Sequence, residues 1–307
     1  MLLGVGLPIS GAWATAPVMR AVATRAEELG YASVWTLQRL LHPVDEEWGP
    51  VYHSVLDPVS ALSYVAGFTE RIRLGIGVVN MPFYAPLVLS KALTTLDVVS
   101  AGRVDVGLGL GWAPQEFTAV GVTPASRGAR AEEFVACLRA TWTDDEVEFH
   151  GKFYELPRCR VEPKPVQRPH PPVLIGGTAE VALRRVGRIA DGWISSSRTD
   201  LTVIGRSIDV VRSAAAQAGR DPQTLRFIVR GLAQLRADAA ADRRPLHGTA
   251  EQLREDLAAL AAQGVTEVFL DSNYDPRIGA GQPDPQAALA GVEELLVALA
   301  PTSNAAH

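Results

Sequence analysis

Short runs of apolar, often β-branched residues alternate along this chain with longer segments whose apolar residues recur at helical spacing. Such runs are typical of strands buried on both faces, and the longer segments are typical of helices that cover a sheet. Eight strand–helix units joined by right-handed connections are expected to close into a barrel. The predicted strands are residues 2–7, 33–37, 72–79, 104–110, 173–175, 193–196, 225–232 and 265–270.

We therefore predict an α/β fold, a single (β/α)₈ TIM barrel with inserted loops. The rival is an open doubly wound sheet, which needs a glycine fingerprint after the first strand, and Pro8 to Ala12 do not supply one. Two β-like runs, 147–149 and 153–154, predict a small hairpin after the fourth helix, 127–142. We expect one domain over residues 1–300 and a C-terminal tail over 301–307.

Composition excludes several classes of protein. A net charge of −5 argues against nucleic-acid binding, and two cysteines exclude a disulfide framework and a multi-cysteine zinc site. Every apolar run is broken by charge, glycine or proline before about 20 residues, so no membrane span is predicted. Residues 1–16 lack the basic start of a signal peptide, so we interpret them as containing the first strand and expect a cytoplasmic protein.

Chemistry in such a barrel is expected where the strands end, and a glycine cluster marks one of these positions. Gly107, Gly109 and Gly111 alternate along the fourth strand, so they share one face. Two interpretations remain open: the missing side chains let a flat ligand approach the backbone, or they allow tight packing in the barrel. Arg230 and Tyr274 also fall at strand ends, without an assigned function.

A second cluster, Gly176-Gly177-Thr178, ends the fifth strand and opens a helix. Backbone N–H groups at a helix start favour a phosphate, and Thr178 is expected to cap the helix. The alternative is an ordinary glycine turn. A substitution that places a charge there, Gly177→Asp, is expected to abolish anion binding without unfolding the barrel.

The usual catalytic motifs are absent from the sequence, and no metal site is predicted. Arg39 follows the second strand. It is either a salt-bridge partner or a residue that holds an anion or a carbonyl group. Glu116 is interpreted as a carboxylate on a helix face, and Asp105 as pointing outside the barrel or into a salt bridge at its lower end.

Several motifs, taken in their order along the chain, resemble the bacterial luciferase-like monooxygenase superfamily. The resemblance covers about residues 1–300, and it is strongest to the branch that uses coenzyme F420, an 8-hydroxy-5-deazaflavin. The motifs are Gly30 to Trp35, Arg71 to Gly75, Leu93 to Asp97, Gly102-Arg103, Gly107 to Phe117, Pro163 to Gly177 and Ala190 to Trp193.

The resemblance implies hydride transfer between F420 and a small organic substrate. It places the ring near Gly77, Val78, Asn80, Gly109 and Gly111, and the phosphate at Gly176, Gly177 and Thr178. It also implies a cis Gly77–Val78 peptide in a bulge behind the ring, and a homodimer with the helix at 86–100 as a candidate interface. The alternatives are an FMN-dependent monooxygenase that works with a separate flavin reductase, and a flavin-binding protein without catalysis.

The sequence departs from this family at the site. Alcohol- and sugar-phosphate-oxidising members carry an Asp-His pair where this chain has Gln38 and Arg39, and the sugar-phosphate enzymes carry Glu where it has Trp112. These departures favour a reductase or an oxygen-using enzyme that acts on an apolar or aromatic substrate. The candidate catalytic residues are therefore Arg39 and Trp112. The expected substrate pocket is lined by Trp48, Tyr52, Phe83 and Tyr84.

Overall fold

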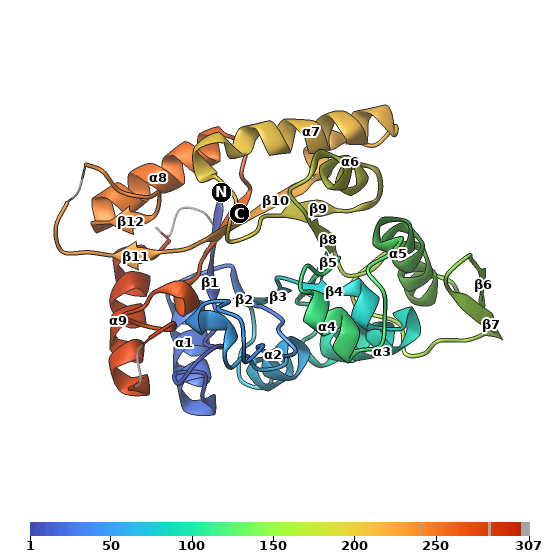
Figure 1. The fold of residues 1–307 in the computed structure, drawn as a ribbon, viewed down its shortest axis with the longest axis horizontal. Helices are drawn as coiled ribbons and strands as arrows, with labels where there is room; N and C mark the ends of the chain where they lie inside the picture. The colour runs from blue at the N-terminus through green and yellow to red at the C-terminus, as the bar shows by residue number, and fades with distance from the viewer. Residues whose placement is uncertain (240, 282–283, 302–307) are drawn as a thin grey trace.

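A closed barrel of parallel strands forms the centre of the protein in the computed structural model, which describes residues 1–239, 241–281 and 284–301 (Figure 1). The strands pair in the order β3-β2-β1-β13-β10-β9-β8-β5-β4, and β3 also pairs with β5, which closes the sheet. Because β3 and β4 are two parts of one interrupted strand, the barrel has eight strands and the predicted fold is confirmed. The strands are β1 (Leu2–Gly6), β2 (Ser33–Thr36), β3 (Arg73–Ile76), β4 (Val79–Asn80), β5 (Val104–Gly109), β8 (Val173–Gly176), β9 (Gly192–Ile194), β10 (Arg226–Gly231) and β13 (Glu267–Leu270).

Helices surround the barrel and cover the outward faces of its strands (Figure 1). They are α1 (Ala16–Glu28), α2 (Pro58–Ala66), α3 (Pro86–Val99), α4 (Pro114–Ala119), α5 (Arg127–Thr143), α6 (Glu180–Ile189), α7 (Ile204–Gln217), α8 (Ala250–Ala262) and α9 (Pro285–Ala298). Single 3₁₀ turns lie at Pro50–Tyr52, Met81–Phe83, Leu201–Val203, Pro222–Thr224 and Ser272–Tyr274. Among the described residues, none of the helices combines the length and apolarity that a membrane crossing requires.

Local sequence signals explain where several helices begin. Asp57 accepts a hydrogen bond from the Ser60 backbone N–H and Pro58 occupies the first turn, so α2 begins directly after a capping residue. Thr249 and Gln252 form a reciprocal capping box at the start of α8.

Alternation along the strands sorts residues between the helices and the barrel interior. On β5, Val104, Val106 and Leu108 join the apolar layer under the helices, whereas Asp105, Gly107 and Gly109 face inward. A middle layer of Trp35, Leu174, Ile194, Ile228 and Phe269 fills the interior, with the Trp35 and Phe269 rings stacked at 5.2 Å. This layer forms the floor beneath the barrel mouth.

The hairpin is present, but its second strand begins later than predicted. β6 (Val147–His150) pairs with β7 (Glu155–Cys159), whereas the sequence placed the second run at 153–154. The N–H groups of Phe153 and Tyr154 instead donate to the Glu133 carboxylate on α5, at 2.7 and 2.6 Å, and this holds them in the turn. Glu116 lies on a helix, as the sequence indicated, but the bounds of this short helix α4 were not predicted. The small parallel pair β11 (Gln234–Leu235) and β12 (His247–Gly248) was not predicted.

Candidate functional site

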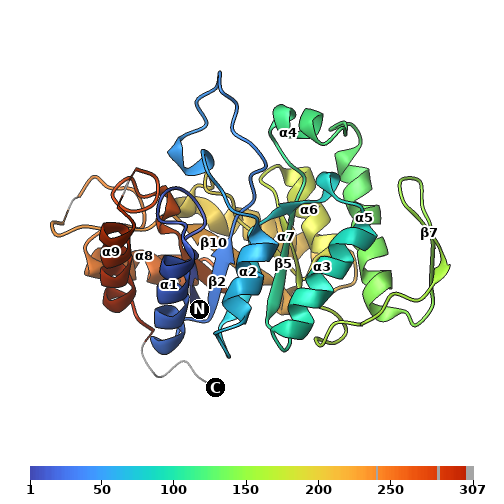
Figure 2. The same cartoon turned by 90° about the horizontal axis from the view of Figure 1, so that it is seen from below.

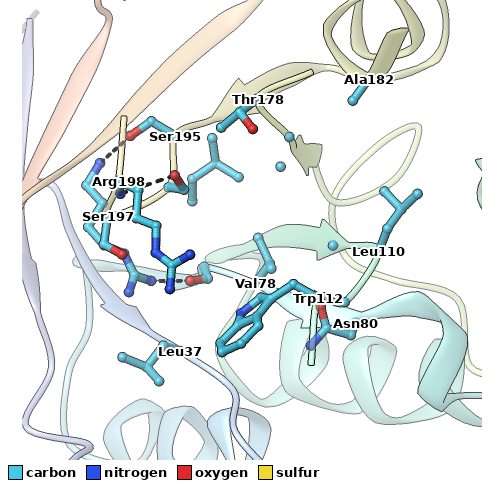
Figure 3. Close-up of a pocket in the computed structure, with 18 of the residues that line it drawn as sticks. Leu37, Val78, Asn80, Leu110, Trp112, Thr178, Ala182, Ser195, Ser197 and Arg198 are labelled. Atoms are coloured by element: carbon cyan, nitrogen blue, oxygen red, sulfur yellow. Dashed lines mark hydrogen bonds between the residues drawn. The ribbon is translucent and has the colours of Figure 1, made fainter. Parts of the chain in front are cut away.

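A cavity of about 600 Å³ opens where the barrel strands end (Figure 3). Its lining comes from the segments that follow β2, β3, β5, β8, β9 and β13, from the ends of β4 and β10, and from the starts of α5 and α6. The structure places all the candidate site residues in this lining: Arg39, Gly77, Val78, Asn80, Gly109, Gly111, Trp112, Gly176, Gly177 and Thr178. They form one site, and their individual functions stay hypotheses.

Among the described residues, the charged side chains that line the cavity are all arginines: Arg39, Arg127, Arg185, Arg198 and Arg230. Three of them lie near carboxylates, at 3.3 Å for Arg39–Glu116, 3.0 Å for Arg185–Glu132 and 3.6 Å for Arg230–Asp271. Arg198 has no carboxylate partner among the described residues; its guanidinium carbon lies 5.5 Å from the Trp112 ring (Figure 3). A cavity lined in this way favours an anionic ligand.

Helix α6 begins at the rim of this cavity without a side-chain cap. Its N-cap residue is Ala179, so the prediction that Thr178 caps the helix is wrong: the helix starts one residue too late for that threonine. Gly177 is fixed by its carbonyl group, which accepts a hydrogen bond from the Trp193 indole at 2.8 Å. Because the first N–H groups of a helix have no intrahelical partner, this end of α6 suits an anion.

Gly107 and Gly109 make room for the neighbouring strand. A Cβ on Gly107 would lie 1.9 Å from the Ile76 carbonyl oxygen, and one on Gly109 would lie 2.6 Å from Val78 Cγ2. The packing interpretation of this cluster therefore holds for both residues. Gly111 follows with a φ of 74°, in the left-handed region that favours glycine.

We expect Gly107→Ala to lower the free energy of unfolding by about 1–3 kcal/mol, because a backbone carbonyl cannot rotate away as a flexible side chain can. Gly176→Ala is the matched control, since its Cβ would come no closer than 3.6 Å to any neighbour. Urea unfolding followed by circular dichroism measures both. Equal stability of the two variants would contradict this account of the packing.

The strand behind the cavity is interrupted by a bulge. Gly75 pairs with Asp105 and Val79 with Leu108, so four steps on the β3–β4 strand face three on β5. The Gly77–Val78 peptide in this bulge is cis, and the prediction is confirmed. Arg230 reaches the bulge from the opposite wall and donates a hydrogen bond to the Gly77 carbonyl oxygen.

Arg39 lies among aromatic side chains at the cavity wall. Its guanidinium carbon is 4.7 Å from the Trp112 ring centre, 5.5 Å from that of Tyr52 and 5.7 Å from that of Trp48. Glu116 on α4 is fully buried beneath it and also accepts the Leu40 backbone N–H at 2.7 Å. Burial lowers the pKa of Arg39, and the Glu116 carboxylate opposes this shift. Glu116 therefore ties the loop after β2 to α4; Figure 2 shows both projecting from the same end of the molecule.

Three of the four aromatic residues expected in a substrate pocket do not line the cavity. Trp48 packs against the Trp112 ring, with the ring centres 4.9 Å apart. Phe83 packs against Phe117 at 5.2 Å, and the Tyr84 hydroxyl accepts a hydrogen bond from Gln38 at 2.6 Å. The 3₁₀ turn directly after β4 carries them out of the lining. Gln38 also accepts the Asn80 N–H at 2.9 Å, so its amide holds the two segments together.

Sequence reasoning gave no function to the polar residues on the wall formed by β10 and β13. Arg230 donates a hydrogen bond to the Tyr274 hydroxyl at 3.2 Å, and the hydroxyls of Tyr274 and Tyr52 lie 3.1 Å apart. Burial raises the pKa of Tyr274, so this hydroxyl stays protonated. The one sequence signal was the position of Arg230 and Tyr274 at strand ends.

Other reactive groups do not converge on the cavity. Among the residues that the structure describes, no three His, Cys, Asp or Glu side chains gather as a metal site would need. Cys137 is buried, and burial raises its pKa to about 11, which disfavours the reactive thiolate.

Comparison with known sequences identifies relatives along most of the chain. The model of the luciferase-like monooxygenase family matches residues 8–245. An uncharacterised protein of Mycobacterium tuberculosis (strain ATCC 25618 / H37Rv) is 35% identical over 252 residues, which cover 81% of this chain and 78% of the relative. The FMNH₂-dependent dimethylsulfone monooxygenase of Pseudomonas putida is 33% identical over 154 residues, which cover 49% of this chain and 42% of that relative. The F420-dependent glucose-6-phosphate dehydrogenase of Amycolatopsis mediterranei is 34% identical over 179 residues, which cover 57% of this chain and 52% of that relative.

Solved structures share the fold over nearly the whole chain. The monooxygenase RslO1 of Streptomyces bottropensis has a TM-score of 0.80 at 24% identity, covering 97% of this chain and 99% of that one. An F420-dependent secondary alcohol dehydrogenase, in complex with an F420–acetone adduct, has a TM-score of 0.78 at 18% identity. The match covers 97% of this chain and 98% of that one. These structures show the fold. The family match and the named relatives show that the chain is an oxidoreductase that belongs to the luciferase-like monooxygenase family.

Proposed function

We propose that the protein is an F420-dependent oxidoreductase, in which a hydride passes between the deazaflavin and an organic substrate at the barrel mouth. The observation that carries this proposal is the cavity beside the uncapped start of α6, whose charged lining, in the part of the chain that the structure describes, consists of arginines. Coenzyme F420 bears a phosphodiester and a carboxylate tail, so it supplies several anionic groups for such a lining. When bound, the cofactor supplies the hydride chemistry, and the protein supplies binding and orientation.

The two sides of the cavity suit different parts of the complex. Gly176, Gly177 and Thr178 would hold the phosphate together with the first N–H groups of α6. Gly77, Val78, Asn80, Gly109 and Gly111 would support the ring along the bulged strand. The wall opposite α6 carries Arg39, Trp112 and Tyr52, and these would contact the substrate and exclude water from it.

A monooxygenase that uses reduced FMN, with a separate flavin reductase, is the second candidate. The start of α6 also suits the single phosphate of FMN, and the Pseudomonas putida relative is named as FMNH₂-dependent. Titration of the purified protein with F420 and with FMN, each oxidised and reduced, decides between them. We expect F420 to bind more tightly; tight FMN binding without F420 affinity would overturn the proposal.

We expect Gly176→Asp to weaken F420 binding at least about tenfold relative to Gly176→Asn, which corresponds to about 1.4 kcal/mol. A Cβ at this position would make ordinary contacts with Val78 and Ile194, which both line the cavity. The added carboxylate would therefore face the phosphate, and asparagine has the same shape without the charge. Fluorescence titration with F420 measures both variants. Equal affinities would remove this glycine cluster from the phosphate site.

Gly176 is a better position for this test than Gly177. A Cβ on Gly177 would lie 2.7 Å from the Ala182 Cβ, so Gly177→Asp would also displace the start of α6. A loss of binding in that variant would not separate charge from geometry.

A further inference from the structure

A chain of hydrogen bonds crosses the barrel mouth from β10 to the loop after β2. Arg230 donates to the Gly77 carbonyl oxygen on one side and to the Tyr274 hydroxyl, at 3.2 Å, on the other. The Tyr274 oxygen lies 3.1 Å from the Tyr52 oxygen. All four residues line the cavity, so the chain joins the bulged strand to the wall on which we place the substrate.

The groups that can donate fix the direction of one link in this chain of hydrogen bonds. A guanidinium group has no acceptor, so the Tyr274 oxygen must accept from Arg230. Either hydroxyl can donate across the 3.1 Å between Tyr274 and Tyr52, because each oxygen has two lone pairs. One arrangement has Tyr274 donating to Tyr52. In this arrangement the Tyr52 oxygen accepts and its own O–H is left to point elsewhere. Within the described residues, Tyr52 Oη has no second hydrogen-bond partner, and the side chain lines the cavity.

The same wall has no group that serves as a base at neutral pH. The cavity lining holds no Asp, Glu, His, Lys or Cys side chain among the described residues. Glu116, the carboxylate nearest to Arg39, is fully buried and contacts Arg39 and the Leu40 N–H. The ionisable side chains that face the ligand are therefore arginines and tyrosines, which donate hydrogen bonds at neutral pH.

We propose that Tyr52 is the proton donor of this site and that its substrate is an electron-accepting carbonyl compound, such as an aldehyde, ketone or enone, whose oxygen accepts the Tyr52 O–H. Tyr274 and Arg230 are positioning residues that hold Tyr52. This inference rests on the proposed function for the source of the hydride, whereas the hydrogen bond to the substrate oxygen does not depend on the identity of the cofactor.

The reaction balances as a reduction. The hydride, with its two electrons, leaves the reduced deazaflavin and forms a C–H bond at the carbonyl carbon, or at the β-carbon of an enone. The carbonyl π electrons move to oxygen, which takes the proton from Tyr52 and becomes a hydroxyl or an enol. The Tyr52 phenolate is held by the Tyr274 O–H and by the positive charge of Arg230 behind it, until solvent returns a proton.

Binding of a coloured enal tests the hydrogen bond without turnover. The probe is 4-(dimethylamino)cinnamaldehyde, whose absorbance band moves to longer wavelength when its carbonyl oxygen is polarised. We expect the wild-type protein, without cofactor, to shift the band to the red and Tyr52→Phe to lose the shift. Tyr64→Phe is the matched control, because that hydroxyl contacts the Ala16 carbonyl oxygen at the surface and lies outside the cavity. A wild type without the shift, or a Tyr52→Phe variant that keeps it, would overturn the proposal.

Reduction of the same enal by reduced F420 tests the proton transfer. We expect Tyr52→Phe to lower kcat about 100-fold, the lower end of what a general acid contributes. Tyr274→Phe should change the pH profile of kcat and reduce the red shift, which a merely structural residue would leave unchanged. If F420 fails as the hydride donor while the red shift follows Tyr52, the cofactor assignment fails and the assignment of Tyr52 stands. A Tyr52→Phe enzyme that reduces the enal at the wild-type rate would refute the proton transfer.

Discussion

Replacement of Asp105 by asparagine is expected to lower the free energy of unfolding by about 3 kcal/mol, because Arg73 loses its carboxylate partner and Arg226 keeps only Glu267. Asp105 is fully buried in the lower end of the barrel, as one of the two sequence interpretations expected. Arg73 donates to its two oxygens at 2.7 and 2.8 Å, and Arg226 does so at 2.5 and 3.2 Å. An asparagine keeps one oxygen but turns an NH₂ group toward the guanidinium groups, so at least one donor loses its acceptor.

The effect of Asp105→Asn should depend on pH. Burial alone would raise the pKa of Asp105, but the hydrogen bonds and charges of Arg73 and Arg226 hold it below its ordinary value. A carboxylate with a lowered folded-state pKa contributes stability that is fully present above its unfolded pKa of about 3.9. That contribution is lost as the pH falls through the folded-state value. The stability gap between wild type and variant should therefore be widest at neutral pH and narrow in acid.

Urea unfolding at pH 7, 5 and 3 measures this gap. Asp145→Asn is the control, since Asp145 is exposed and the described residues offer it no ion-pair partner. The control should match wild type within about 0.5 kcal/mol. An Asp105→Asn variant that is as stable as the control at pH 7 would show that the network contributes nothing.

The sequence predicted the barrel because apolar residues recur at different spacings in buried strands and in the helices that cover them. Val104 to Gly109 illustrates this, since three outward apolar residues alternate with Asp105, Gly107 and Gly109. Helix α5 ends within one residue of the predicted range 127–142. The sequence placed Glu116 on a helix but gave the bounds of α4 no prediction, because six residues are too few to show a helical period. The hairpin was displaced because Glu133, a residue distant in sequence, binds the N–H groups of its turn.

The wall of the cavity was predictable and its contacts were not. Position at a strand end selects residues such as Arg39, Gly77 and Gly176, because the topology alone puts strand ends at one mouth. Contacts across that mouth join residues far apart in the chain, and no local pattern records them. Tyr52 and Tyr274 are 222 residues apart, and Arg230 lies 153 residues from Gly77. The glycines show the same limit, since only the structure reveals that Ile76 and Val78 occupy the space beside Gly107 and Gly109.

Substitutions at Arg39 and Glu116, which form an ion pair, should have strongly coupled effects on the free energy of unfolding. Glu116 is fully buried and the Arg39 side chain is 6% exposed, so water solvates neither charge well. Glu116→Gln removes the charge but keeps an oxygen that can accept the Leu40 N–H, so its effect isolates the ion pair from the loop contact. We expect this variant to lose about 3 kcal/mol of unfolding free energy, because breaking a buried pair leaves an uncompensated charge.

Arg39→Met should also destabilise the protein, since it leaves the Glu116 carboxylate without its cation. The double variant, Arg39→Met with Glu116→Gln, should lose clearly less than the sum of the two single losses, because no unpaired charge remains buried. Methionine also keeps an apolar stem among Trp48, Tyr52 and Trp112. Urea unfolding of all four proteins gives the coupling energy. Additive losses would mean that Arg39 and Glu116 act independently, and that the contact between Glu116 and Leu40, rather than the ion pair, holds the loop after β2 against α4.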